Sequence, residues 1–190
     1  MRYPHLVDVA WDVVIGFLRD WHAEPYRWAQ EIDVQVEIAG RLSTALRLLG
    51  RDIVVANYRT GAVQGFETNQ RWSRLTCEPA IRYTYTDGRT YTCKPDIVMW
   101  DDIPDANNPP DEHGGNFPIL WACEVKYKCQ EPSDWDLQKL RFLVRDGTMR
   151  FGCWIRMERA RAVGGSGIDW KRDLEDGRVW LCDAPKHARG

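Results

Sequence analysis

Two segments, Lys94-Pro95-Asp96-Ile97-Val98-Met99-Trp100 and Ile119-Leu120-Trp121-Ala122-Cys123-Glu124-Val125-Lys126, are the most informative part of the chain. Each is a short apolar run beside charged residues, which is typical of a buried strand. On a strand, Glu124 and Lys126 share one face because side chains alternate with a period of two. Asp96 opens the other run, which can lie next to the first. The two segments therefore predict that two carboxylates and an ammonium group meet on neighbouring strands.

Two carboxylates held this close repel each other unless a positive charge lies between them. A divalent cation such as Mg²⁺ removes this conflict, because it prefers oxygen ligands and keeps several waters. Asp96, Glu124 and the backbone carbonyl of Val125 are the candidate ligands. Lys126 would then stand beside the attacking water and the phosphate, where an ammonium group orients the water and stabilises developing charge. We therefore expect a site for Mg²⁺ or Mn²⁺.

Around these segments the sequence predicts further strands and a helix. Residues 75–86 and 89–100 flank Asp87-Gly88, a strong signal for a β-hairpin. Residues 101–118 are rich in proline, asparagine and acids, which favours a loop. The remaining elements expected after the second segment are a helix from Ser133 to Gly147 and strands over residues 149–157 and 178–182.

The N-terminal part predicts two helices, over residues 6–21 and 26–49, and then a short strand over residues 53–56. Glu31 and Gln35 fall within the apolar stripe of the second helix, whereas Glu37 points to the opposite flank. The apolar residues of that stripe are Ile32, Ala39, Leu42, Leu46 and Leu49.

This order of elements predicts an α/β fold with a central mixed β-sheet flanked by helices. The length of 190 residues fits one domain. We expect an N-terminal helix over residues 1–25, a core over residues 26–157 and a C-terminal extension over residues 158–190.

Pro95-Asp96 followed by Glu124-Val125-Lys126 resembles the motif of the PD-(D/E)XK nuclease superfamily, whose core is the restriction-endonuclease-like fold. The stretch from Glu31 to Gln35 resembles the family's helix with a conserved acid, and Asp136 to Leu140 resembles the helix after its ExK strand. The resemblance implies a metal-dependent nuclease that hydrolyses phosphodiester bonds, with DNA favoured over RNA. It implies that Asp96, Glu124 and Glu31 bind the metal and that Lys126 assists the attacking water.

Other residues are candidates for supporting roles in such a nuclease. Glu37 is the alternative helix ligand, and Gln35, Glu78 and Gln138 are candidates to hold the metal ligands in place. The candidate contacts to substrate phosphates are Lys94, Lys128, Lys139 and Arg141.

Composition limits the partners and the compartment. The net charge of −2 is not that of a protein that binds nucleic acid by overall charge, so binding needs a local basic surface or metal ions. No apolar run is long enough to span a membrane, and the N-terminus lacks the core of a signal peptide. We therefore expect a cytoplasmic protein whose six cysteines are reduced thiols. A homodimer would suit cleavage of both strands of a duplex.

Two other functions stay open from the sequence. The first is a nuclease-fold module that binds nucleic acid without cleaving it, or a subunit of a larger complex with that role. The second is an unrelated α/β protein that binds a small molecule or a protein. The second would lack a cluster of acids able to hold a metal.

Overall fold

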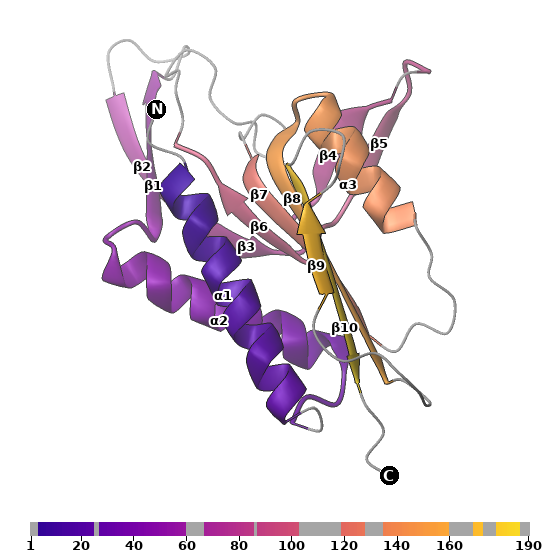
Figure 1. The fold of residues 1–190 in the computed structure, drawn as a ribbon. Helices are drawn as coiled ribbons and strands as arrows, with labels where there is room; N and C mark the ends of the chain where they lie inside the picture. Colours follow the sequence, from indigo (N-terminus) through magenta and orange to yellow (C-terminus); the bar gives the residue numbers. More distant parts are fainter. Residues whose placement is uncertain are drawn as a thin grey trace.

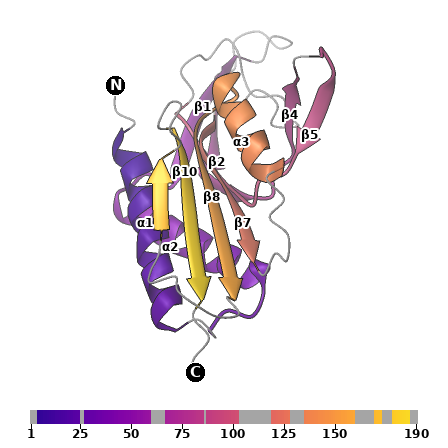
Figure 2. The same ribbon diagram turned by 45° about the vertical axis from the view of Figure 1, so that its right-hand side comes forward.

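The computed structural model describes residues 4–24, 27–59, 67–85, 87–102, 119–127, 135–159, 169–172 and 178–186. A six-stranded mixed sheet forms the centre of the molecule (Figure 1). Two long N-terminal helices cover one face of the sheet, and a shorter helix covers the other face (Figure 2). The predicted α/β architecture, with a mixed sheet between helices, is confirmed.

Three helices and ten strands make up the described chain. The helices are α1 (Pro4–Ala23), α2 (Glu31–Leu48) and α3 (Trp135–Arg145). The strands of the central sheet are β3 (Leu75–Cys77), β6 (Ile97–Trp100), β7 (Ile119–Tyr127), β8 (Met149–Arg159), β9 (Asp169–Arg172) and β10 (Val179–Lys186). Two separate hairpins consist of β1 (Ile53–Arg59) with β2 (Glu67–Ser73), and β4 (Ile81–Thr84) with β5 (Thr90–Cys93).

The strand order in the central sheet is β3-β6-β7-β8-β10-β9. β6 is antiparallel to β3 and β7, whereas β7, β8 and β10 run parallel to one another. The C-terminal extension adds β10 beside β8 and places β9 at the edge. The last strand is therefore longer than the predicted 178–182, because its pairing with β8 continues to Lys186.

The face covered by α1 and α2 is mainly apolar, and Gln35 of α2 is a polar side chain buried there. Trp21 of α1 and Trp121 of β7 are among its largest fully buried side chains. Three thiols from neighbouring strands, Cys123, Cys153 and Cys182, are also buried there. The five described cysteines are free, as expected, and Cys129 lies outside the described residues. In the part of the chain that is described, no helix is both long and apolar enough to cross a membrane.

α2 differs from its prediction in its start and in its buried face. It begins at Glu31 rather than Tyr26, because Asp33 accepts the backbone N–H groups of Ala29 and Gln30 and so ends the preceding loop. Ile32 and Leu49, assigned to the buried stripe, are exposed. The residues that the helix buries are Val34, Gln35, Ile38, Leu42 and Leu46.

The predicted hairpin around Asp87-Gly88 is present but is divided in two. Its base, β3 with β6, belongs to the central sheet, and its outer part, β4 with β5, is a separate ribbon. The division falls after Glu78, which has a φ of 50° and donates its N–H to the carbonyl of Asp96; the next residues along the two strands are Pro79 and Pro95. Proline has no N–H to donate to a strand ladder, so pairing stops where the ribbon leaves the sheet.

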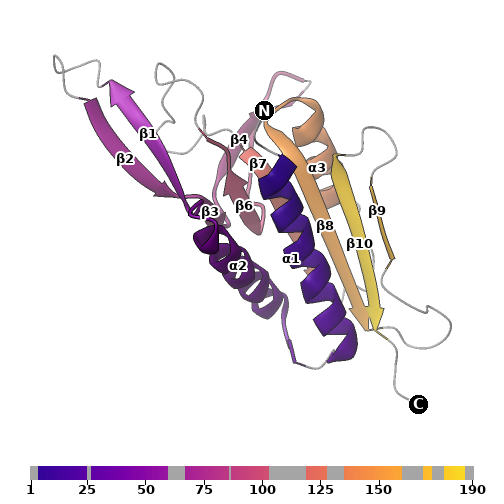
Figure 3. The same ribbon diagram turned by 60° about the vertical axis from the view of Figure 1, so that its left-hand side comes forward.

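The β1–β2 hairpin extends beyond the central sheet (Figure 3). The sequence predicts only the beginning of β1, and β2 and β9 have no clear sequence signal. Arg74, 1% exposed, fixes the base of this hairpin. Its guanidinium donates to the carbonyls of Arg51 (2.7 Å), Trp100 (3.0 Å) and Ile53 (3.4 Å) and pairs with Asp102.

Candidate active site

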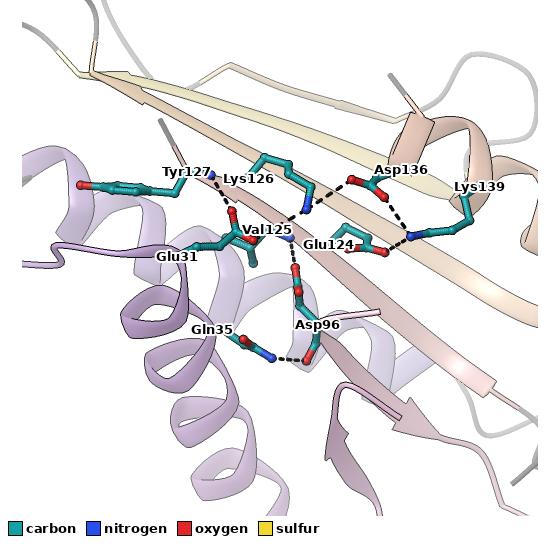
Figure 4. Close-up of polar contacts among 9 residues, drawn as sticks. All are labelled: Glu31, Gln35, Asp96, Glu124, Val125, Lys126, Tyr127, Asp136 and Lys139. Atoms are coloured by element: carbon teal, nitrogen blue, oxygen red, sulfur yellow. Dashed lines mark hydrogen bonds and ion pairs between the residues drawn. The ribbon is translucent and has the colours of Figure 1, made fainter. Parts of the chain in front are cut away.

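The alternation of β7 separates two kinds of environment. Val125 and Tyr127 point into the apolar core under α1 and α2. Glu124 and Lys126 point to the other face, toward α3 (Figure 4). The prediction that Glu124 and Lys126 share one face is confirmed. Glu124 is 2% exposed, which is rare for a carboxyl group.

The side chain of Asp96 contacts β7, and its backbone carbonyl is hydrogen-bonded to neighbouring residues. Its Oδ2 accepts the N–H of Val125 at 2.6 Å, next to Glu124 in sequence. Its carbonyl oxygen accepts Nε2 of Gln35 at 2.7 Å and the N–H of Glu78 at 3.1 Å. Gln35 therefore lies where a supporting residue was expected, whereas Glu78 contacts Asp96 through its backbone.

Glu31 lies at the first turn of α2, beside the end of β7. One of its oxygens accepts the N–H of Tyr127 at 3.2 Å, and the other lies 3.7 Å from Nζ of Lys126. Glu37 turns away and forms an ion pair with Arg41, which also binds Asp20 of α1. Of the two helix acids considered from the sequence, Glu31 is the one next to Lys126.

α3 supplies two further charged residues. Nζ of Lys139 lies 2.6 Å from Oε1 of Glu124 and 2.9 Å from Asp136, and Asp136 also lies 3.2 Å from Nζ of Lys126. Sequence reasoning did not assign Asp136 to the site and assigned Lys139 to phosphate contact. Their spacing of three on a helix places them on one side, which was the available signal. We call Glu31, Asp96, Glu124, Lys126, Asp136 and Lys139 the carboxylate–lysine cluster.

Burial governs the electrostatics of the two strand acids. It raises the pKa of Glu124 to about 7; Lys139 opposes this rise, and Asp96 and Asp136 add to it. Burial also raises the pKa of Asp96, although the N–H of Val125 and the charge of Lys126 oppose this. Both acids therefore lie where a nearby positive charge is needed to hold them ionised.

The other ionisable groups of the cluster respond to these acids. Burial alone would lower the pKa of Lys126 and of Lys139, but the surrounding carboxylates raise both. Burial would raise the pKa of Asp136, but Lys139 and Lys126 lower it. The two lysines thus remain protonated and neutralise part of the acid cluster.

The donor atoms of the cluster fit a divalent cation in their chemistry, because all are oxygens and the two strand acids lack enough positive charge. Within the described residues, no three His, Cys, Asp or Glu side chains are gathered closely enough to hold a metal ion. Lys139 instead occupies the position beside Glu124. A cation bound by Glu124 would therefore compete with Lys139.

Of the four remaining predicted residues, the structure describes three. Lys94 and Gln138 are exposed, and Arg141 is partly buried on α3. Lys128 lies outside the described residues. Comparisons with protein-family models, with curated proteins and with solved structures find no match to this chain.

Proposed function

We propose that this protein is a metal-dependent nuclease of the PD-(D/E)XK type with a restriction-endonuclease-like core, acting on DNA in preference to RNA. The observation that carries the proposal is Glu124. It is a buried carboxyl with a pKa raised to about 7, on the same strand face as Lys126 and beside Asp96. Buried groups with a perturbed pKa and a specific charged partner are typical of functional sites.

The proposed division of roles follows from the contacts. Asp96 and Glu124, with the carbonyl of Val125 and with Glu31 at the helix end, would hold Mg²⁺ or Mn²⁺ once their side chains come closer together than the structure places them. When bound, such a cation would lower the pKa of water and offset the charge of the phosphate. Lys126 would orient the water and stabilise charge developing on the phosphate oxygens. Gln35 would keep Asp96 in place through its backbone carbonyl.

The pairing of Lys139 with Glu124 favours a second candidate, a nuclease-fold module that binds nucleic acid without cleaving it. In that case the lysines would neutralise the acids permanently, and no metal would be needed. The two candidates differ in what a cation does to the protein. Only the nuclease requires a cation to take the place of Lys139 beside Glu124.

Cleavage of plasmid and single-stranded DNA tests the proposal directly. Wild-type protein should cut with Mg²⁺ or Mn²⁺ and should be inactive with chelator. Asp96→Asn should be inactive with either metal, and Glu37→Gln should match the wild type because Glu37 pairs with Arg41 outside the cluster. If the wild type binds DNA but cuts none with either metal, the non-cleaving module is the better description.

A further inference from the structure

The outer hairpin, β4 with β5, carries a row of tyrosines on one side. Tyr83 and Tyr91 are direct cross-strand partners, so their side chains share a face, and Tyr85 follows on the same face. Arg82 and Thr92 form the pair next to them and point to the opposite face. We call Tyr83, Tyr85 and Tyr91, together with Phe142 of α3, the tyrosine face.

The rings of this face hold one another in fixed positions. Tyr83 and Tyr91 are stacked with centroids 5.9 Å apart, and Tyr85 contacts Phe142 at 4.5 Å. The hydroxyl of Tyr91 donates to Asp87 at 3.1 Å. Even so, Tyr85 is 43% exposed and Tyr91 is 40% exposed. The face therefore offers aromatic surface to solvent without needing to rearrange.

In the described part of the chain, the exposed aromatic side chains are found on one side of the sheet. Among the side chains that the structure describes, the exposed aromatic ones are Tyr85, Tyr91 and Trp135. All three belong to the outer hairpin or to α3, on the side of the sheet toward which Glu124 and Lys126 point. Exposed apolar side chains on α2, on the other side, are aliphatic.

The tyrosine face continues directly from the carboxylate–lysine cluster. Phe142 follows Lys139 by three residues on α3, so the two lie on one side of the helix. Tyr83 contacts Phe142 at 5.7 Å, and Lys139 is near enough to Tyr83 to oppose the rise that burial causes in the pKa of its phenol. Exposed Lys94 lies between β5 and Asp96.

Cations flank the rings. Arg145 lies 6.0 Å from the ring of Phe142, and the largely exposed side chain of Arg89 lies 3.9 Å from Asp87 at the hairpin turn. The acid at the turn, Asp87, is already engaged by Tyr91 and by the backbone N–H of Arg89. Aromatic rings interleaved with basic side chains are the combination that binds single-stranded nucleic acid.

We propose that the tyrosine face stacks against unpaired bases of a single-stranded or frayed DNA segment whose backbone enters the carboxylate–lysine cluster. This inference rests on the proposed function and adds the class of substrate to it. Unpaired bases are required because bases in an intact duplex have no free face for a ring to stack on. The preferred substrate is therefore a strand with unpaired bases rather than a continuous duplex.

Fluorescence anisotropy with labelled oligo(dT), and with the same strand in a duplex with oligo(dA), tests this inference. All proteins carry Asp96→Asn, with Mg²⁺ present, so that binding is measured without cleavage. Tyr85→Ala and Tyr91→Ala remove rings, and Tyr85→Leu keeps apolar packing on Phe142 without a ring. Thr92→Ala is the matched control on the opposite face of β5, and Leu48→Ala is an exposed control on α2. Melting temperatures verify that each variant is folded.

The parent should bind oligo(dT) more tightly than the duplex. Each tyrosine variant should lose about 5- to 150-fold in affinity for oligo(dT), the range for loss of one stacking ring, and both controls should bind as the parent does. Tyr85→Leu should lose affinity like Tyr85→Ala while remaining as stable as the parent. The inference is overturned if the parent binds no single strand or if folded tyrosine variants bind oligo(dT) like the parent. It is also overturned if the tyrosine variants lose as much affinity for the duplex as for oligo(dT).

These outcomes separate the inference from the function on which it rests. If the wild type cleaves DNA with metal while the tyrosine variants bind and cleave normally, only the tyrosine face is assigned wrongly. If the tyrosines are needed for binding but the wild type cleaves nothing, the face is supported and the nuclease is contradicted.

Discussion

Among the described residues, buried charge occurs in two places, and the two differ in what surrounds it. At the base of the β1–β2 hairpin, the guanidinium of Arg74 donates to three backbone carbonyls and pairs with Asp102. Nearby, the fully buried Asp101 pairs with Arg150 at 2.9 Å. Most of the acceptors around Arg74 are fixed backbone atoms, so this network joins strands; burial also raises the pKa of Asp101 here, and Arg150 and Arg74 oppose the rise.

In the carboxylate–lysine cluster, the carboxylates are neutralised by lysine side chains rather than by fixed backbone groups. Two lysines are shared among four carboxylates, and the pKa of both strand acids stays raised despite them. The proposed function requires this cluster to exchange one cation for another, whereas Arg74 is held mainly by backbone carbonyls. Burial of charge is therefore weak grounds for a functional site, and incomplete neutralisation by movable side chains is stronger grounds.

The largest effect is expected for Arg74→Met. The change leaves buried carbonyls without a donor and Asp102 without its closest partner, so the free energy of unfolding should fall by about 3–5 kcal/mol. Urea denaturation measures this, with Arg82→Met as an exposed control that should stay within about 0.5 kcal/mol of the wild type. A loss below about 1 kcal/mol would mean that Arg74 does not join the strands as described.

Lys126→Ala should reduce turnover by about 10²–10³-fold, because it removes a positioned positive charge beside the reacting phosphate. Metal affinity should be largely kept, since Lys126 is not a ligand. Stability should change by about 1 kcal/mol or less, because Asp136 keeps its contact with Lys139. Plasmid cleavage, metal titration and denaturation measure the three quantities. Equal cleavage by variant and wild type would remove Lys126 from the mechanism.

The raised pKa of Glu124 predicts a pH dependence of stability in the presence of chelator. The folded state holds the Glu124 proton up to about pH 7, whereas the unfolded chain releases it near pH 4.5. The stabilisation is complete below pH 4.5 and is lost as pH rises through 7, so the free energy of unfolding falls by up to about 3 kcal/mol. Glu124→Gln should lack this part of the slope in urea denaturation. If the free energy of unfolding has the same pH slope in Glu124→Gln and in the wild type, the raised pKa is not that of Glu124.

The smallest effect concerns the two helix acids. Glu31→Gln should lower cleavage about tenfold, because it weakens the contacts with Lys126 and with the N–H of Tyr127. Glu37→Gln should cleave like the wild type, since its partner is Arg41. Comparing the two variants at one metal concentration is sufficient. If Glu37→Gln lowers cleavage and Glu31→Gln does not, the side of α2 that lies against β7 is assigned wrongly.

The sequence predicted the elements that have strong local signals. The apolar runs at Ile97–Trp100 and Ile119–Tyr127, the turn at Asp87-Gly88 and the glycines after α2 and α3 each favour one local structure. The joint placement of Asp96, Glu124 and Lys126 followed from strand alternation and from adjacent strands. These parts depend on short-range chemistry, which a sequence shows directly.

The parts that the sequence could not predict depend on contacts between distant segments. β2 is specified by pairing with β1 rather than by its own polar sequence. The contact of Lys139 with Glu124 depends on how α3 lies on the sheet, which helical spacing alone does not define. The exposure of Ile32 reflects the position of α1 beside α2, which rotates the buried stripe toward Val34 and Ile38.

The proposed nuclease requires the carboxylate–lysine cluster to exchange Lys139 beside Glu124 for a divalent cation. Isothermal calorimetry with Mn²⁺ tests it most directly, with Asp96→Asn and Glu124→Gln as the ligand variants and Glu37→Gln as the control. We expect saturable Mn²⁺ binding by the wild type and the control, and a loss of at least about tenfold in affinity in each ligand variant. Absence of Mn²⁺ binding by the wild type, or unchanged binding in both ligand variants, would contradict it.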